Sequence, residues 1–219
     1  SWRTLSLLGA GVGVAAVLAN TSLDADFQQW HDRDVKSRST DRFAFAAKWL
    51  GEGMIVIPVF AGAALLGPLG DPPFPAAQAV GDWGSRCTRS VLVGGPPLLA
   101  LTYLLGASRP SEDRGSHWKP FDDNNGVSGH AFIGAIPFLN AARMVECPAG
   151  KVALYGASVL PAWSRINDRK HYLSQAVLGW WLAWLAADVA DRTEACQQNF
   201  TLLPQLTDDG VAIEMACRW

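Results

Sequence analysis

The stretch NNGVSGHAFIG, residues 124–134, places a serine, a glycine and a histidine between a polar segment and a long apolar run. Serine is a preferred N-cap residue, so Ser128 predicts that a helix begins here. The amides of Gly129 and His130 would then lie in the first turn, where unpaired N–H groups attract an anion. The stretch therefore predicts a helix start that holds an anion beside a group able to transfer a proton.

Apolar runs of this kind recur along the chain and indicate the fold class. They are rich in Ala, Leu, Gly and Val, and their lengths suit helices better than strands. The six runs cover residues 5–19, 54–67, 91–107, 131–142, 152–163 and 176–187. Strands and helices do not alternate, so we expect an all-α fold, a bundle of six helices.

The composition favours a membrane location for this bundle. Hydrophobic residues make up 49% of the 219 residues and charged residues 17%, a low charged fraction for a soluble protein. Ten tryptophans are present, several near the ends of apolar runs, as in membrane-interface belts. Several runs fall short of the about 20 residues that a spanning helix needs, so a compact soluble bundle stays open beside a transmembrane one. The net charge of −2 predicts no binding to nucleic acid.

The two ends of the chain suggest additional elements. The first apolar run, with Arg3 before it, has the pattern of a signal peptide or of a retained first helix, and we expect the helix. Residues 20–48 are polar and predict a short amphipathic helix at an interface. The stretch FTLLPQLTDDGVAIEMACRW, residues 200–219, predicts two short strands around a turn, a β-hairpin-like tail.

We therefore expect a helical membrane domain over residues 1–190, with its functional motifs within 102–175, and a separate tail over 191–219. Cys196 and Cys217 flank this tail. Their pairing in an oxidising compartment and two buried free thiols are both open.

Three polar segments interrupt the helices, at residues 106–121, 126–130 and 164–175. Between His130 and Ser164 the chain has room for two antiparallel helices, which would return it to the same end of the bundle. The loop between the apolar runs 91–107 and 131–142 lies at that end of the bundle as well. Helical hairpin geometry thus predicts one cluster, formed by Arg109, Ser128, His130, Arg165 and His171.

This cluster has the chemistry of an oxyanion site. Two guanidinium groups, on Arg109 and Arg165, offer permanently charged planar forks for phosphate-like oxygens. Two imidazoles, on His130 and His171, can supply a nucleophile and a proton donor. Four acidic residues could resemble a metal cluster: Glu112, Asp113, Asp122 and Asp123. They lie in a loop and the Arg/His site needs no metal, so we expect neither a metal ion nor another cofactor.

Arg-Pro at 109–110, Ser-Gly-His at 128–130 and Ser-Arg-x5-His at 164–171, in this order and at these separations, resemble the motifs of the type 2 phosphatidic acid phosphatase (PAP2) superfamily. This superfamily contains lipid phosphatases, soluble acid phosphatases and vanadium haloperoxidases. The resemblance covers residues 102–190 and implies a six-helix bundle of the PAP2 type.

The resemblance also implies roles. His171 would attack phosphorus and form a phosphohistidine, while His130 would protonate the leaving oxygen and then activate water. The phosphoryl oxygens would be held by Arg109, Arg165, Ser128 and Gly129. Positioning and electrostatic stabilisation of this kind are most of what phosphoryl transfer requires.

The chain departs from the family pattern at three positions. The usual lysine of the first motif is Thr102, the usual proline before Ser-Gly-His is Val127, and the usual aspartate four residues after the nucleophilic histidine is Gln175. Lys119 either replaces the missing cation or is a solvated loop charge. In a helix, Gln175 would lie on the same face as His171 and accept its ring N–H without adding a charge.

The last departure leaves two consequences open. In serine proteases, replacing the analogous Asp by Asn costs about 10⁴ in rate, so catalysis here would be slower. Alternatively, another carboxylate such as Asp168 stands in for the missing charge.

The leading expectation is a membrane-embedded phosphatase that acts on a lipid phosphate or diphosphate. Its partners would be the lipid phosphate substrate and membrane lipids. The resemblance to bacterial members implies a multi-pass protein of the bacterial inner membrane with an extracytoplasmic active site. Two alternatives are a soluble acid phosphatase or vanadate-dependent haloperoxidase, and a catalytically lapsed membrane protein that binds lipid phosphates.

Overall fold

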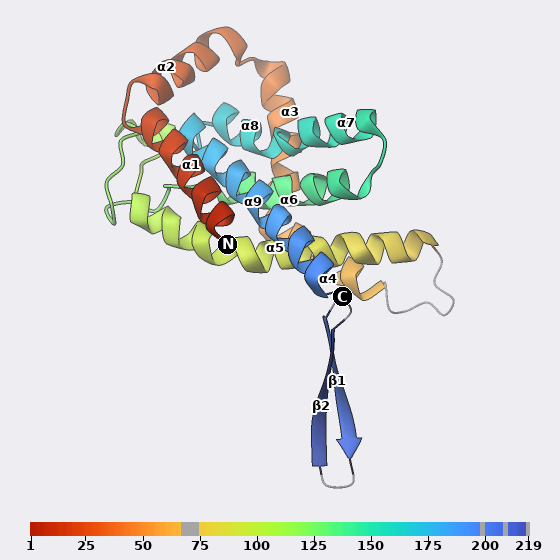
Figure 1. The fold of residues 1–219 in the computed structure, drawn as a ribbon. Coiled ribbons are helices and arrows are strands. Elements are labelled where there is room, and N and C mark those ends of the chain that lie inside the picture. The colour runs from red at the N-terminus through yellow and green to blue at the C-terminus, as the bar shows by residue number, and fades with distance from the viewer. Residues whose placement is uncertain (67–74, 198–199, 208–209, 218–219) are drawn as a thin grey trace.

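The computed structural model describes residues 1–66, 75–197, 200–207 and 210–217, with side chains as far as residue 193. All six apolar runs are helical within these residues, which confirms the predicted helical bundle (Figure 1). The α-helices are α1 (Trp2–Ala19), α2 (Leu23–Trp30), α3 (Arg38–Lys48), α4 (Gly53–Leu66), α5 (Pro75–Leu105), α6 (Gly129–Met144), α7 (Pro148–Ser158), α8 (Leu160–Asn167) and α9 (Leu173–Gln197). The fifth run is divided between α7 and α8 near Val159.

The polar segment 20–48 contains more helix than the single amphipathic helix predicted from it. Helices α2 and α3 are joined by the π-helical turn η1 (His31–Val35), and α3 continues into the 3₁₀ turn η2 (Trp49–Gly51). Ser37 begins α3, because its side chain accepts a hydrogen bond from the amide of Thr40 and the Thr40 hydroxyl accepts one from the amide of Ser37. Such a capping box stabilises a helix start within an otherwise polar stretch.

Helix α9 lies in the middle of the bundle and packs against α1, α5 and α6 (Figure 1). Small residues permit these close contacts. A Cβ atom on Gly94 would lie 2.6 Å from the ring of Phe132 and 2.8 Å from Ala186. A Cβ atom on Gly11 would lie 2.3 Å from the ring of Trp181. Contacts through small residues are typical of helices that pack within a membrane.

The outer surface of the bundle is apolar. Leu92 and Leu99 of α5 are 69% and 61% exposed, Leu65 of α4 is 68% exposed and Val152 of α7 is 73% exposed. A soluble protein rarely exposes this many large apolar side chains over adjacent helices. The surface therefore supports a location in a membrane.

Among the described residues, three helices are long and apolar enough to cross a membrane: Trp2–Ala19, Pro75–Glu112 and Leu173–Thr193. The pair Arg38–Gly51 and Gly53–Leu66 would make a fourth span, bent by 48° at the break between them. Glu52 is the residue at this break. A multi-pass arrangement is consistent with these lengths.

The tail forms the hairpin that the sequence predicted. Strand β1 (Phe200–Thr207) pairs antiparallel with β2 (Gly210–Cys217), in a register that places Phe200 opposite Cys217 and Thr207 opposite Gly210. The side chains of Cys196 and Cys217 lie outside the described residues, as does the turn at 208–209. Their pairing and the division of the chain near residue 190 stay predictions.

Candidate active site

Hydrogen bonds join the three polar segments at one end of the bundle. The amide of Ser128 donates to the carbonyl of Gln175 at 3.0 Å, and Gln175 Nε2 donates to the carbonyl of Ser108 at 2.8 Å. The amide of Ser111 donates to the carbonyl of Arg169 at 3.1 Å. The segments that follow α5, precede α6 and precede α9 therefore meet, as helical hairpin geometry predicted.

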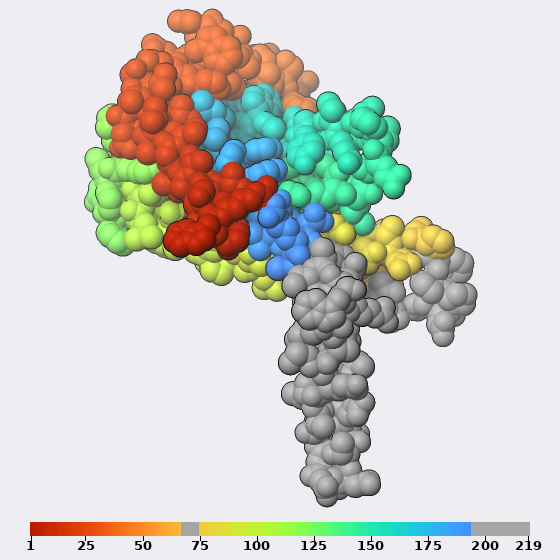
Figure 2. Space-filling view, in the orientation of Figure 1, coloured from red at the N-terminus to blue at the C-terminus, as the bar shows by residue number. Residues whose placement is uncertain are grey.

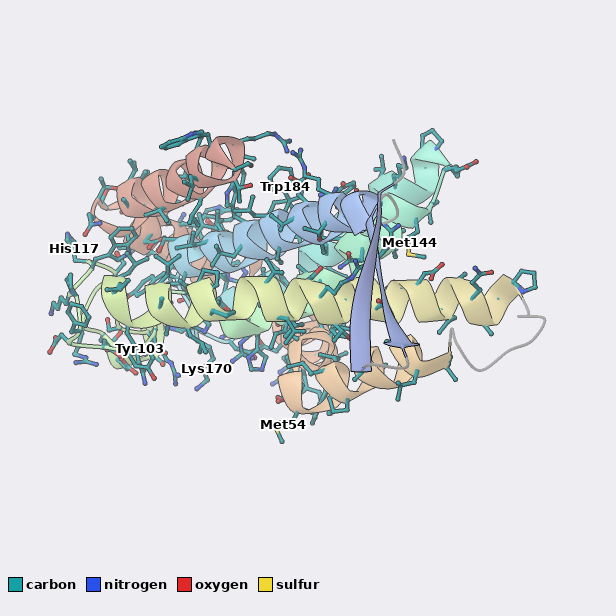
Figure 3. All side chains as sticks on the ribbon, turned by 60° about the horizontal axis from the view of Figure 1, so that its bottom comes forward. Met54, Tyr103, His117, Met144, Lys170 and Trp184 are labelled. Carbon is teal, nitrogen blue, oxygen red and sulfur yellow. The ribbon has the colours of Figure 1, made fainter. Side chains whose placement is uncertain are left out.

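The path of α6 to α8 explains this meeting. Helix α6 leads away from Ser128 to Met144, and α7 and α8 bring the chain back to Asn167. In the view of Figure 3, Tyr103 and Lys170 lie toward one end of the molecule and Met144 lies toward the other. The outgoing and returning helices predicted between His130 and Ser164 are confirmed.

Ser128 begins α6 as an N-cap. Its extended backbone, at φ −83° and ψ 108°, and its hydroxyl, which accepts from the amide of Ala131, have the geometry of this position. The amides of Gly129 and His130 precede the first hydrogen bond of the helix, which Phe132 donates to the Ser128 carbonyl. A Cβ built on Gly129 would meet no other described part of the chain within 4 Å beyond its own neighbours and turn, so the helix start has room for an anion beside it.

Gln175 orients the ring of His171. Oε1 of Gln175 lies 2.8 Å from Nδ1 of His171 and also accepts the amide of Tyr172 at 3.1 Å. Because Nε2 of Gln175 donates to the carbonyl of Ser108, the amide group cannot be turned over without losing two bonds. The ring must therefore carry its proton on Nδ1, which leaves the lone pair on Nε2 of His171 free to act as a nucleophile.

His171 is neutral in this environment. The pKa of its imidazole is lowered to about 3, mainly by burial and also by the charges of Arg165, Arg109 and His130, against the hydrogen bond that the ring donates to Gln175. Arg165, Arg109 and His130 therefore lie near enough to His171 for their charges to act on its ring. A neutral ring with a free lone pair is the form that a nucleophilic histidine requires.

The two arginines are held by different partners. Arg109 Nε donates to Oδ1 of the buried Asn125 at 2.8 Å. Arg165 forms an ion pair with Asp168, with 3.4 Å between Nη1 and Oδ2. Nε of Arg165 is buried and has no hydrogen-bond partner among the described residues. A buried donor without a partner indicates a place for a bound acceptor, such as a phosphoryl oxygen.

Asp168 is placed by this ion pair as a partner of Arg165. The ring of His171 is bound by Gln175, so the structure does not favour Asp168 as the substitute for the missing carboxylate. Among the described residues, no group of three or more His, Cys, Asp or Glu side chains is arranged to hold a metal ion.

Glu52 is a neighbour of the site that the sequence analysis missed. Its Oε2 lies 3.5 Å from Nε2 of His130, and both side chains are about one third exposed, at 37% and 35%. Burial lowers the pKa of His130 and Arg165 lowers it further, whereas Glu52 raises it. In the sequence, Glu52 is a carboxylate between Gly51 and Gly53, just before an apolar run. Nothing in the sequence connects this residue with His130.

Asp24 of α2 is a second contribution from outside the motifs. This buried carboxylate accepts hydrogen bonds from the amide and the hydroxyl of Ser174, in the first turn of α9. It therefore caps the helix that follows His171. The bond joins α2 to the residue that precedes Gln175.

The loop after α5 holds the backbone of Lys119. Its amide donates to the carbonyl of Gly106 at 2.6 Å, and Gly106 has the left-handed φ of +47°. A Cβ there would lie 2.0 Å from the Lys119 carbonyl, so this turn requires glycine. Lys119 is exposed, and the question whether its side chain binds phosphate or is a solvated loop charge stays open.

The other two departures from the family pattern are structural in this fold. Thr102 donates its hydroxyl to the carbonyl of Leu98 within α5, and its own carbonyl accepts the amide of Gly126. Val127 is buried in the main hydrophobic core. Both residues thus anchor the loop that leads into α6.

An apolar cavity of about 480 Å³ lies next to the helices that carry the site. Its wall includes Phe27 of α2, Trp163 and Ile166 of α8, and Leu173 and Trp180 of α9. Figure 2 shows α9 (blue) at the bottom of a hollow between α1 and α2 (red) and α7 (teal). Of the wall residues, Ile166 precedes His171 in the chain and Leu173 follows it, so an apolar surface adjoins the polar site.

The fold is similar to that of a solved membrane phosphatase. A crystal structure of a transmembrane PAP2-type phosphatidylglycerolphosphate phosphatase from Bacillus subtilis is similar to this chain with a TM-score of 0.64. The two sequences are 14% identical, and the match covers 90% of this chain and 98% of that chain. No protein-family model and no curated protein matches the sequence. The chain therefore has the PAP2-type transmembrane fold, and the resemblance indicated by its motifs is confirmed for the fold.

Proposed function

We propose that the chain is a membrane-embedded phosphatase that hydrolyses a lipid phosphate monoester or diphosphate through a phosphohistidine intermediate. The observation that carries this proposal is the pairing of a nucleophile with an anion site. His171 has a free Nε2 lone pair because Gln175 holds Nδ1, and Arg165 next to it has a buried Nε for which the described part of the chain offers no hydrogen-bond partner. The similarity of fold to a PAP2-type phosphatase supports the same reading.

In the proposed first step, Nε2 of His171 attacks phosphorus and the bond between phosphorus and the leaving oxygen breaks. A proton passes from His130 to that oxygen, so that an alcohol or a phosphate departs. Charge on the phosphoryl oxygens is stabilised by Arg109, Arg165 and the first-turn amides of α6. The groups are in place before substrate arrives, which lowers the cost of reorganisation in the transition state.

In the proposed second step, a water molecule attacks phosphorus on the opposite side from His171. His130, now neutral, accepts a proton from this water. The bond between phosphorus and Nε2 breaks, inorganic phosphate leaves, and His171 returns to its neutral form. The sum of both steps is hydrolysis of one phosphate ester or anhydride bond.

The lipid class of the substrate is supported by the surroundings of the site. The apolar exterior of α4 and α5 places the bundle in a membrane, and the apolar cavity beside Ile166 and Leu173 offers a surface for a hydrocarbon chain. We propose an inner-membrane protein of a bacterium, with this end of the bundle on the extracytoplasmic side. Lys119 is proposed as an additional phosphate-binding cation at the mouth of the site.

The experiment that tests the proposal is phosphate release by the purified, detergent-solubilised protein. The panel comprises glycerolipid phosphates, prenyl diphosphates and soluble phosphate esters, for the wild type and for His171→Ala. We expect release from lipid substrates and no measurable release by the variant. Radiolabelled phosphate should be trapped on histidine in the wild type, and trapping on another residue type would contradict the assignment.

A second candidate is a lapsed enzyme that binds lipid phosphates. The specific observation in its favour is that neutral side chains, Thr102 and Gln175, stand where the family has a lysine and an aspartate. This candidate predicts binding of phosphate lipids without turnover for every member of the panel. Halide oxidation with added vanadate, in place of phosphate release, would instead indicate a haloperoxidase.

A further inference from the structure

Glu52 lies on the partly open side of the site, at the break between α3–η2 and α4. Its carboxylate faces Nε2 of His130 at 3.5 Å. The residue is neither in the motif segment 102–175 nor on a helix that carries a motif. Its place beside His130 is therefore a property of the folded chain that the motifs do not describe.

Close backbone packing brings Glu52 to this position. A Cβ on Gly51 would lie 2.5 Å from the carbonyl oxygen of His130, so the backbone of Gly51 is seated on the first turn of α6. A Cβ on Gly134, one turn further along α6, would lie 3.0 Å from the Cα of Gly51. The two glycines let the break approach α6 closely, and the 48° bend directs the chain away again afterwards. These close contacts of Gly51 with α6 hold the next residue, Glu52, beside His130.

The charges around His130 come from three elements. Lys48 at the end of α3 and Arg165 of α8 are cations, and Glu52 is the anion among the described groups that act on it. His171 lies close enough to be affected by His130 in turn. Burial and the two cations all disfavour a protonated His130, and Glu52 opposes them. Without Glu52, the charges that act on the proposed proton donor would be those of Arg165 and Lys48.

We propose that Glu52 is a positioning residue for His130, whose carboxylate lies against Nε2 and holds the imidazole in the protonated form that gives a proton to the leaving oxygen. The inference rests on the proposed function. In the first step, the bond between phosphorus and the leaving oxygen breaks as His130 gives up this proton. In the second step His130 takes a proton from water, and Glu52 again stabilises the imidazolium that results.

The test compares two leaving groups in the same enzyme. Phosphatidic acid has an alcohol leaving group that needs a proton, whereas p-nitrophenyl phosphate releases a phenolate that leaves without one. For Glu52→Gln, we expect kcat/KM for phosphatidic acid at neutral pH to fall by about tenfold, within the roughly 10²- to 10⁴-fold that general acid catalysis contributes. For p-nitrophenyl phosphate, we expect a change of less than about twofold, because this reaction does not draw on the His130 proton.

The pH profile gives a second readout. The alkaline limb of kcat/KM for phosphatidic acid should move to lower pH in Glu52→Gln, because removal of the anion lowers the pKa of His130. Glu52→Asp keeps the charge and should restore part of the lost rate. A purely structural role would not produce a shift that depends on charge and on the leaving group.

Matched variants separate the outcomes. Glu146→Gln removes an exposed carboxylate beyond the far end of α6 and should match the wild type. His130→Ala should show the same dependence on leaving group as Glu52→Gln, but more strongly. Equal losses on both substrates, or no loss on either, would overturn the role of Glu52. A wild type inactive on both esters and on the lipid panel would instead overturn the proposed function itself.

Discussion

Nδ1 of His171 lies 2.8 Å from Oε1 of Gln175, four residues further along the chain. Like a carboxylate at this position, Gln175 orients the ring of His171 and fixes which ring nitrogen carries the proton. Unlike a carboxylate, its amide has no net charge and cannot stabilise an imidazolium electrostatically. The site thus separates orientation from charge stabilisation, and the consequence can be measured.

Gln175→Leu should reduce kcat by about 10²- to 10⁴-fold, by analogy with loss of the orienting group in a catalytic triad. It also removes the partners of the Tyr172 amide and the Ser108 carbonyl, which should cost about 1–3 kcal/mol of stability for each group left buried and unpaired. Enzyme kinetics and the melting temperature measure the two effects separately. A Leu variant with wild-type kcat would show that orientation of His171 is unimportant.

Gln175→Asp should maintain or raise kcat, because the carboxylate supplies the missing charge next to His171. The shorter side chain cannot donate to the Ser108 carbonyl, so the melting temperature should fall. A large loss of kcat in a folded protein would show that the amide is specifically required. The ratio of kcat values at equal saturation, measured on one lipid substrate, decides between these results.

The pH dependence follows from the two histidines. The pKa of His171 is lowered to about 3, so this nucleophile stays neutral far below the usual histidine range. The pKa of His130, the proposed acid, is also lowered from 6.5, so His130 loses its proton at a lower pH than an ordinary histidine. The kcat/KM of the free enzyme should therefore be highest on the acid side of pH 6.5. An optimum above pH 8 in a lipid phosphate assay would contradict these assignments.

The free energy of unfolding should also depend on pH, but it should decrease toward acid pH, where the activity is expected to be highest. Between pH 6.5 and about 3, the unfolded chain binds a proton at His171 that the folded chain excludes. The free energy of unfolding should therefore be complete above pH 6.5 and decrease as the pH falls through this window. His171→Gln should flatten the decrease, which a series of thermal melts in detergent would detect.

Arg165→Lys keeps a positive charge but loses the fork of N–H donors, including the buried Nε. We expect kcat/KM to fall by about 10²- to 10³-fold, as for loss of one preorganised donor. Inhibition by inorganic phosphate should weaken in parallel. Lys151→Ala, a change of an exposed cation on α7, is the matched control and should leave both values unchanged. Equal phosphate inhibition in Arg165→Lys and the wild type would remove Arg165 from the anion site.

Lys119→Ala and Thr102→Lys test the missing cation of the first motif. If Lys119 binds phosphate, the alanine variant should raise the inhibition constant for inorganic phosphate by about tenfold, the effect of one lost charge-assisted hydrogen bond. Thr102→Lys should tighten phosphate binding in that variant. An unchanged inhibition constant in Lys119→Ala would identify Lys119 as a solvated loop charge.

Local patterns in the sequence predicted the parts of this site that depend on local geometry. The N-cap at Ser128 follows from capping preference, and the meeting of the motif segments follows from helix and loop lengths. The contact between His171 and Gln175 was predicted from a helix over 171–175, but α9 begins at Leu173, so the contact forms across the turn that precedes the helix. Glu52 and Asp24 could not be predicted in this way, since each reaches the site from a part of the chain that is distant in sequence. The second helix in the polar segment was missed because a capping box, and not an apolar face, starts it.

The bond between Asp24 and Ser174 links two parts of the molecule that meet different solvents. Helix α2 is amphipathic and lies outside the candidate spans, whereas Ser174 begins the central span one residue before the partner of His171. A displacement of α2 would therefore act, through this one carboxylate, on the support of His171, the proposed nucleophile. Under the proposed membrane location, the lipid around α2 would become a condition for the alignment of that ring.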